Sequence, residues 1–575
     1  LHTNLSLDAR AFGVTLGPAD AYRLARGDEI TTTWGQQIKL SRPLDWLVVS
    51  DHSDAMGTMN EIVKGNPTLI RDPVVKDWYR RINQGGDVAL AATMEVIETF
   101  AGITGKSIPA ILMDDEFVGS VWEDYLDVAE AYNEPGRFST IIGYEWTSTE
   151  NGNNLHRNVL YRDGETEAKQ ALPYTTAESF NPEDLWKWMQ AYEDKTGGNV
   201  LALAHNGNVS NGLMFPETNP ATGRKLSKDY AETRAKWEPI YEVTQIKGDG
   251  EAHPFLYPDD EFADYEPWDK ANLGPTPKED WMLEFEYARS ALKNGLKLEE
   301  RLGINPYKFG MVGSTDSHTG LATAEENNFF GKHSGKEPSA HRWSALVGEF
   351  GDTRYYGWEQ VSSGYAAVWA TENTRKAIFD AMERKEVYAT TGPRMTVWFF
   401  GGWDFEPMDA VARTPGMIGY TKGVSMGGDL MNAPDGKAPS FLVAALKDPY
   451  SGNLDRIQII KGWLDDDGDT HEKVYDVIWS DDREPGADGK LPPVGNTVNV
   501  EDATFTNTIG ESEMITVWED PDFDPDQRAF YYARVIEIPT PRWTAFDAKR
   551  FGVEMSDEVP MTTQERAYTS PIWYT

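Results

Sequence analysis

The sequence contains no cysteine. Disulfide bonds, thiolate metal sites, cysteine nucleophiles and sulfatases whose nucleophile is made by modifying cysteine are therefore excluded. There is also no run of about eighteen uninterrupted apolar residues, so the sequence predicts no membrane-spanning helix. Basic residues are few: 54 Lys and Arg stand against 93 Asp and Glu, for a net charge of −39. Because such a surface repels phosphate backbones, binding of a nucleic-acid duplex is disfavoured.

The first residue, Leu1, is neither methionine nor the start of a charged-then-apolar leader. Both features are typical of a mature or trimmed product, so we expect an exported bacterial protein, periplasmic or secreted. Because no strand precedes His2, we also expect that the sequence begins inside its first structural element.

The length of 575 residues, 40% of them hydrophobic, predicts two to four domains. Over residues 1–394, apolar strands alternate with helical patterns, which predicts parallel β/α units in a barrel or an open α/β sheet. Within this part, residues 56–135 resemble a helical insertion. Over residues 395–575, strands follow one another without helices, which predicts an antiparallel β-rich domain, sandwich-like in form.

Histidine is scarce and unevenly distributed. Only nine histidines occur, and five of them lie beside the ends of expected strands. A single such histidine is more often a hydrogen-bonded core residue than a ligand, but five at comparable positions indicate a metal site. Functional residues gather in the loops that follow strands of α/β sheets and barrels. The residues expected to meet there are His2, Asp8, His52, Glu145, His156, His205, Asp316 and His318. Imidazole and carboxylate mixtures suit zinc, manganese or iron.

These residues lie within short motifs, namely His2-Thr3 with Asp8, Asp51-His52, Gly143-Tyr144-Glu145, His156, Ala204-His205 and Asp316-Ser317-His318. Together they resemble the PHP (polymerase and histidinol phosphatase) metallohydrolases over residues 1 to about 394. The spacing from Glu145 to His156 fits that family well. Two longer segments, 16–22 and 387–392, look like the bacterial domain-of-unknown-function family numbered 3604. Similar segments occur in members of the carbaryl-hydrolase type.

The resemblance implies an α/β fold, a distorted (β/α)7 barrel of PHP type, with two or three divalent metal ions at its C-terminal face. It divides the eight ligands over three ions, and Glu145 bridges the first two. The three groups are His2, Glu145 and Asp316; Glu145, His156 and His205; and Asp8, His52 and His318.

The sequence departs from the family pattern at two points. The pattern begins with two histidines one residue apart, and only the second, His2, is present. The spacing from His2 to Asp8 is one residue longer than is common. If the chain begins inside its first element, we expect it to bind its first metal poorly.

Four further residues are candidates for the catalytic site. Asp51 stands beside His52 and could orient it from outside the ligand set, although a solvated acid or a helix cap is about as common. Arg157, Arg342 and Arg394 could grip an anionic substrate bidentately. Arginines beside a barrel, however, more often form surface ion pairs.

We therefore expect a hydrolase that uses a metal-activated hydroxide on phosphate mono- or diesters, with a small-molecule ester as its substrate. One alternative keeps the metals and changes the bond, to a carbamate, a carboxylic ester or a sulfate ester. Another alternative is a non-catalytic ligand-binding protein whose barrel is a relic, but a relic need not keep eight scattered ligands. The sequence leaves the oligomeric state open.

Overall fold

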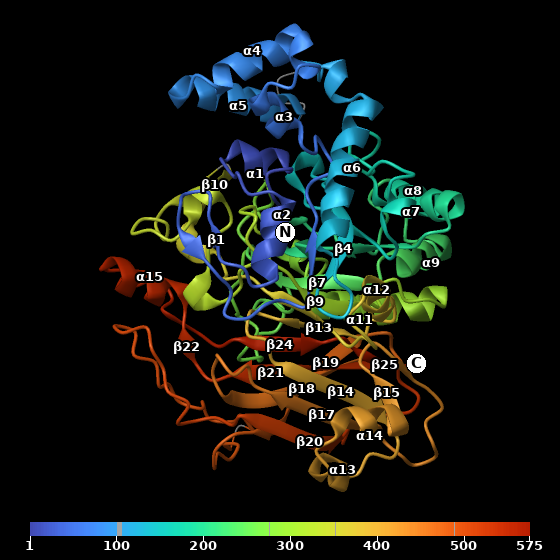
Figure 1. The fold of residues 1–575 in the computed structure, drawn as a ribbon. Coiled ribbons are helices and arrows are strands. Elements are labelled where there is room, and N and C mark those ends of the chain that lie inside the picture. Colours follow the sequence, from blue (N-terminus) through green and yellow to red (C-terminus); the bar gives the residue numbers. More distant parts are fainter. Residues whose placement is uncertain (101–105, 275, 351, 488) are drawn as a thin grey trace.

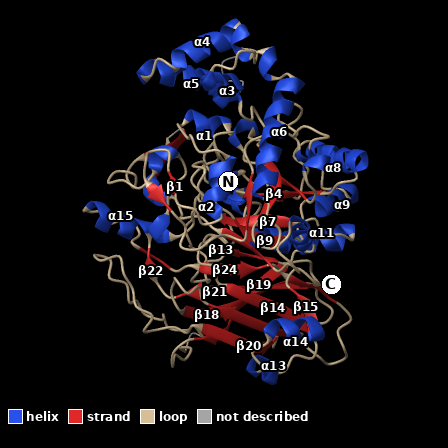
Figure 2. Cartoon of the chain, in the orientation of Figure 1, coloured by secondary structure: helices blue, strands red, loops and turns tan. Residues whose placement is uncertain are grey.

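The computed structural model describes residues 1–100, 106–274, 276–350, 352–487 and 489–575 (Figure 1). Helices are concentrated in the N-terminal part of the chain, and stacked strands make up most of the C-terminal part (Figure 2). Among the described residues, none of the helices has the length and apolar character needed to cross a membrane.

A seven-stranded sheet organises the N-terminal part. Its strands are β3 (Trp46–Val49), β4 (Ser139–Trp146), β5 (Arg157–Tyr161), β6 (Val200–Ala204), β7 (Ile240–Gln245), β8 (Gly248–Asp249) and β9 (Gly310–Gly313). The order is β3-β4-β5-β6-β7, and both β8 and β9 pair with β7. The pairs β3–β4, β6–β7 and β7–β9 are parallel.

The expectation of parallel units is wrong for β5, which runs antiparallel to both β4 and β6. Only ten residues separate the end of β4 from the start of β5. A parallel crossover needs a dozen or more residues, so the chain must turn back beside the strand it has just left.

The long strands of this sheet are buried on both faces, as their continuous apolar runs predict. Because side chains alternate along a strand, each strand contributes to two cores. On β4, Ile141 packs into one core and Ile142 into the other. On β6, Leu201 and Ala202 divide in the same way. The backbone at the strand ends is therefore held from two sides.

Helices pack against this sheet. Tyr125, on α6 (Asp115–Tyr132), donates a hydrogen bond to the carbonyl of Val49 and accepts one from the amide of Gly143, which ties the helix to β3 and β4. The other helices of this part outside 56–135 are α1 (Leu7–Ala11), α2 (Pro18–Ala25), α7 (Glu165–Ala168), α8 (Pro182–Thr196), α9 (Lys228–Trp237), α10 (Asp280–Leu283), α11 (Ala288–Leu302) and α12 (Arg375–Glu383).

The helical pattern expected over residues 56–135 is confirmed. It comprises α3 (Thr58–Lys64), α4 (Pro73–Ile82), α5 (Gly86–Phe100) and α6. Asp72 caps α4 by accepting hydrogen bonds from the amides of residues 74 and 75. Val75, Trp78 and Val96 share a small core of their own. In Figure 1, α3, α4 and α5 project beyond the N-terminal body at the top of the view.

Two larger sheets occupy the C-terminal part. The four-stranded one has the order β15 (Gly423–Ser425), β14 (Thr396–Gly402), β17 (Ser440–Leu446) and β20 (Glu513–Glu519). The eight-stranded one contains β12 (Tyr365–Val368), β13 (Val387–Thr390), β24 (Arg566–Thr569), β21 (Ala529–Glu537), β18 (Leu454–Leu464), β19 (Thr470–Trp479), β16 (Asp429–Leu430) and β25 (Ile572–Tyr574). Val397 and Val443 of the first sheet share a core with Ile459 and Ala533 of the second.

The two parts of the chain are joined through this architecture. Strands β12 and β13 precede residue 394, but β13 pairs with β24 and so belongs to the C-terminal sheet. Phe530 and Trp573 also pack into the core that contains Tyr307 and Met311. Part of the C-terminal sheet therefore comes from the first 394 residues.

The remaining elements are short. They are the hairpins β1 (Ile30–Thr31) with β2 (Gln37–Ile38), β10 (Leu346–Phe350) with β11 (Thr353–Tyr356) and β22 (Thr540–Pro541) with β23 (Thr562–Thr563), and the helices α13 (Pro407–Val411), α14 (Pro415–Lys422) and α15 (Trp543–Phe551).

The carboxyl of Glu537, at the end of β21, is fully buried. Its Oε2 accepts hydrogen bonds from Ser451 Oγ at 2.5 Å and from the amide of Gly452 at 3.3 Å. Its Oε1 has no hydrogen-bond partner in the part of the chain that the structure describes. Burial raises the pKa of Glu537 from 4.5 to about 8, and the nearby charge of Asp448 adds to this effect.

Replacing this carboxyl by an amide should therefore change how stability depends on pH. A raised folded-state pKa means that the native state holds the proton more tightly, so the group stabilises the fold below pH 4.5 and this contribution is lost as pH rises towards 8. The Glu537→Gln variant lacks this titration. Urea unfolding should show that the variant gains stability relative to wild type by up to about 1.4 kcal/mol per pH unit across that range. A difference that is constant with pH would contradict this account.

Candidate metal centre

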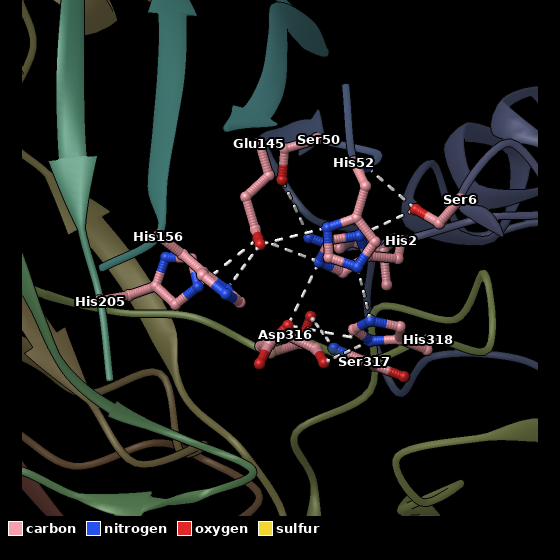
Figure 3. Close-up of polar contacts among 12 residues, drawn as sticks. His2, Ser6, Ser50, His52, Glu145, His156, His205, Asp316, Ser317 and His318 are labelled. Carbon is pink, nitrogen blue, oxygen red and sulfur yellow. Dashed lines mark hydrogen bonds and ion pairs between the residues drawn. The ribbon is translucent and has the colours of Figure 1, made fainter. Parts of the chain in front are cut away.

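Seven imidazole and carboxylate side chains meet at one edge of the seven-stranded sheet (Figure 3), and Asp8, which contacts two of them, makes the eighth member of the cluster. The N-terminal segment and five strand ends supply them. They are His2 and Asp8 from the N-terminal segment, His52 after β3, Glu145 on β4, His156 before β5, His205 after β6, and Asp316 and His318 after β9.

His156 is the one member that precedes its strand. The prediction that the ligands follow strands is wrong for His156. Because β5 is antiparallel to its neighbours, the start of β5 lies at the same sheet edge as the ends of β4 and β6. The reversed strand therefore delivers His156 to the cluster from the opposite chain direction.

Glu145 lies at the middle of the cluster. Its Oε2 is 3.2 Å from Nε2 of His2 and 3.4 Å from Nε2 of His205. Its Oε1 is 3.2 Å from Nδ1 of His52 and 2.9 Å from Nδ1 of His156. Each oxygen of this single carboxylate thus faces two imidazoles.

Asp8 extends the cluster on the side of His52 and His318. Its two oxygens lie 3.4 Å from Nε2 of His52 and 3.0 Å from Nε2 of His318. The two Nε2 atoms are 3.2 Å apart. On the other side, Nε2 of His2 lies 3.2 Å from Oδ1 of Asp316. Among the described residues, three groups of ligand atoms are compact enough to surround an ion: His2, His52 and His318; Glu145, His156 and His205; and His2, Glu145 and Asp316.

These distances fit metal ligation. Two ligand atoms bound about 2.1 Å from one ion lie about 3.0–3.4 Å apart in octahedral or tetrahedral geometry. The Oε2 atom of Glu145 and the Nε2 atom of His205 are buried and have no hydrogen-bond partner among the described residues. Since buried polar atoms are normally satisfied, a cation between them would meet both requirements. The donor set of imidazoles and carboxylates suits zinc, manganese or iron.

Neighbouring side chains hold the rings in place. Such contacts to the second ring nitrogen fix the orientation of a histidine ligand. The contacts join His2 Nδ1 to Ser6 Oγ (3.0 Å), His52 Nδ1 to Thr147 Oγ1 (2.6 Å), His156 Nε2 to Thr149 Oγ1 (2.7 Å) and His205 Nδ1 to Asn158 Nδ2 (3.2 Å).

Burial keeps four of the imidazoles neutral at pH 7. It lowers the pKa of His2 and of His156 to about 4. The pKa values of His205 and His318 also fall well below the ordinary value, again chiefly through burial. A neutral imidazole is the form that binds a metal, so these residues need not lose a proton first.

His52 differs from the other four. Burial acts to lower its pKa, but the carboxylates of Asp8 and Glu145 raise the pKa to about 10. Burial acts to raise the pKa of the Asp8 and Glu145 carboxyls. The surrounding imidazoles have the larger effect and hold both pKa values well below the ordinary range. A cation bound here would therefore displace the proton of His52.

Asp51 contacts the N-terminal segment and not the ring of His52. Its carboxylate accepts hydrogen bonds from the amide and hydroxyl of Thr3 at 2.6 and 2.7 Å and from those of Ser6 at 3.1 and 2.7 Å. Adjacent side chains of an extended chain point to opposite sides, so Asp51 and His52 diverge. The proposed role is corrected accordingly: Asp51 positions His2, through Ser6.

Arg157 does not reach the site, contrary to its candidacy. It follows His156 on an extended strand, so it points away from the cluster. Its guanidinium is buried and pairs with Glu238, with Nε 2.9 Å from Oε1. Arg157 is thus part of a structural ion pair within the protein.

Arg394 and Arg342 lie elsewhere too. Arg394 donates to the carbonyls of Pro43 and Arg42 at 2.7 and 2.9 Å and lines a cavity of about 670 Å³ whose walls include none of the eight ligand candidates. Arg342 forms a two-pronged ion pair with Asp547 at 2.5 and 2.9 Å. Neither arginine can therefore hold a substrate at the cluster.

Two lysines that the sequence analysis missed contact the cluster. Lys247 pairs through Nζ with Oδ2 of Asp316, and Lys332 Nζ lies 2.9 Å from the same oxygen. Burial lowers the pKa of Lys332 to about 8 and that of Lys247 well below the ordinary value. Lys247 stands two residues after β7. A polar residue just after a strand is also the pattern by which the sequence marks most of the ligands. Lys332 lies in a loop without a preceding strand, so no comparable signal marks it.

Fold and site together define a mixed α/β protein with a buried cluster of His, Glu and Asp residues that could hold metal ions. The whole chain, residues 1–575, matches the family described as "Protein of unknown function (DUF3604)" and belongs to that family. The family expected from segments 16–22 and 387–392 is thereby confirmed. No curated protein and no solved structure matches the chain.

Removing His156 and His205 together should empty one part of the cluster. Both face Glu145, whereas the group of His2, His52 and His318 does not include them. In the double alanine variant, the manganese or zinc bound after dialysis, measured by mass spectrometry, should fall by about one equivalent per chain.

The matched control is His471→Ala, which removes a half-exposed histidine of β19 that pairs with Asp465 outside the cluster. This control should keep the metal content of wild type. Full metal content in the double variant, at an unchanged thermal unfolding temperature, would contradict the assignment of these ligands.

Proposed function

We propose that this protein is a metal-dependent phosphoesterase of the PHP type, acting on phosphate mono- or diesters with two or three divalent ions held by the eight clustered residues. The observation that carries the proposal is Glu145, whose two oxygens each face two imidazoles at 2.9–3.4 Å. A carboxylate placed in this way suits the bridge between two ions.

A second line of support comes from the grouping of the ligands. The PHP resemblance implies a group of His2, Glu145 and Asp316 and a group of Glu145, His156 and His205, and the same two groups are compact in the structure. The third implied group contains Asp8, which contacts His52 and His318. The curled seven-stranded sheet, with all ligands at one edge, is compatible with a distorted (β/α)7 barrel.

Bound divalent ions would supply a water nucleophile at neutral pH and would offset the charge that grows on the phosphoryl oxygens. The protein itself contributes rigid placement of the ligands. Ser6, Thr147 and Thr149 hold three of the imidazole rings, and Asp51 holds the segment that carries His2. Such preorganisation lowers the cost of reaching the transition state.

The exposure of the ligands indicates where a substrate would enter. The side chain of Asp8 is 33% exposed and that of His52 is 12% exposed. The other six candidates are at most 8% exposed. A small ester would therefore approach from the side of Asp8, and the buried residues would keep bulk water from the far side of the centre.

The activity test uses the full chain loaded with manganese or zinc. We expect turnover of an aryl phosphate or a bis-aryl phosphodiester, and a loss of kcat/KM of roughly 100-fold or more in the His156→Ala plus His205→Ala variant. His471→Ala should retain the wild-type rate.

The same assay includes aryl carbamates, carboxylic esters and sulfates. If the protein hydrolyses one of these compounds and no phosphate ester, the proposed phosphoesterase activity is wrong and the bond it cleaves is the one in that compound. Inactivity towards all of them in metal-loaded protein would favour a non-catalytic ligand-binding protein. The metal identity and the location outside the cytoplasm stay predictions.

A further inference from the structure

We propose that Lys247 binds an anionic oxygen of the substrate and thereby selects phosphate monoesters over uncharged esters at this centre. The inference rests on the proposed function and specifies its substrate class. A lysine just after β7 would thus bind the substrate anion, a role for which the arginines were candidates.

The first argument is position. In the sheet, β7 lies between β6, which leads into His205, and β9, which leads into Asp316. Lys247 follows β7 at the same edge and so stands between two ligands that belong to different metal groups. A phosphoryl group that reaches both groups of ions would meet an ammonium at this point.

The second argument is that the two carboxylate oxygens of Asp316 have different partners. Its Oδ1 faces His2, at 3.2 Å from Nε2, and so belongs to the ligand cluster. Its Oδ2 meets Lys247, Lys332 and, at 2.9 Å, the amide of Gln245. The two oxygens of one carboxylate therefore contact a ligand of the cluster on one hand and two lysines on the other.

The third argument is the number of N–H donors of Lys247 that have no acceptor among the described residues. Lys332 donates to Oδ2 of Asp316 at 2.9 Å and to the carbonyl of the same residue at 2.5 Å. Lys247 meets a single acceptor, Oδ2 of Asp316, among the residues that the structure describes. Since an ammonium has three N–H groups, Lys247 keeps two donors for a ligand. It is also the more exposed of the two, at 12% against 8%.

The fourth argument is charge. Two lysines share one carboxylate oxygen, and the neighbouring centre would hold divalent cations. Divalent cations favour a ligand with more than one negative charge. A phosphate monoester is such a ligand near neutral pH, whereas carbamates and carboxylic esters are uncharged.

The test measures binding of inorganic phosphate to manganese-loaded protein by calorimetry, and KM for an aryl phosphate and for an uncharged aryl acetate. In Lys247→Met, phosphate binding should weaken by about tenfold or more, and KM for the aryl phosphate should rise in parallel. Metal content, measured by mass spectrometry, should be unchanged. Lys247→Arg keeps the charge and should retain phosphate binding within about threefold of wild type.

The control for overall charge is Lys473→Met, which removes a half-exposed lysine on β19 paired with Asp522. It should leave phosphate binding unchanged. Wild-type phosphate affinity in Lys247→Met would overturn the proposal. Loss of metal from that variant would also overturn it, because the lysine would then serve the ligands and not the substrate.

The outcome is separable from that of the proposed function. Phosphate binding that depends on Lys247, in protein that hydrolyses no ester, would support the anion site and refute the enzyme. Ester hydrolysis together with phosphate binding that does not depend on Lys247 would support the enzyme and refute the anion site.

Discussion

The structure depends on one buried carboxylate, that of Glu145, which lies among four imidazoles. A negative charge in such a place is costly unless several groups compensate it. Here the compensation comes from residues spread over more than two hundred positions of the chain. The surrounding fold can be understood as the framework that holds those residues against this one side chain.

The seven-stranded sheet provides that framework. Its long strands are buried on both faces, so their ends have little freedom, and six of the eight ligands stand at or close to strand ends. The C-terminal sheets add to this rigidity, since Phe530 and Trp573 pack into the core beneath the N-terminal sheet. A centre built in this way is held by the whole molecule and not by one loop.

Much of this arrangement can be predicted from the sequence, because burial leaves a clear pattern. The run 200–204 is apolar throughout and coincides with β6, and His205 follows it. Strand direction leaves no such pattern, so the reversal of β5 escapes prediction. Asp51 and Arg157 neighbour true members of the cluster, and alternation along an extended chain turns them away. Lys332 comes from a loop, where position in the sequence says little about position in space.

The most direct test of the central claim is anomalous diffraction from crystals of the manganese- or zinc-loaded protein. The account predicts metal peaks on both sides of Glu145, each about 2.0–2.3 Å from one of its oxygens. Peaks that lie only at surface carboxylates, with Glu145 free of metal, would contradict it.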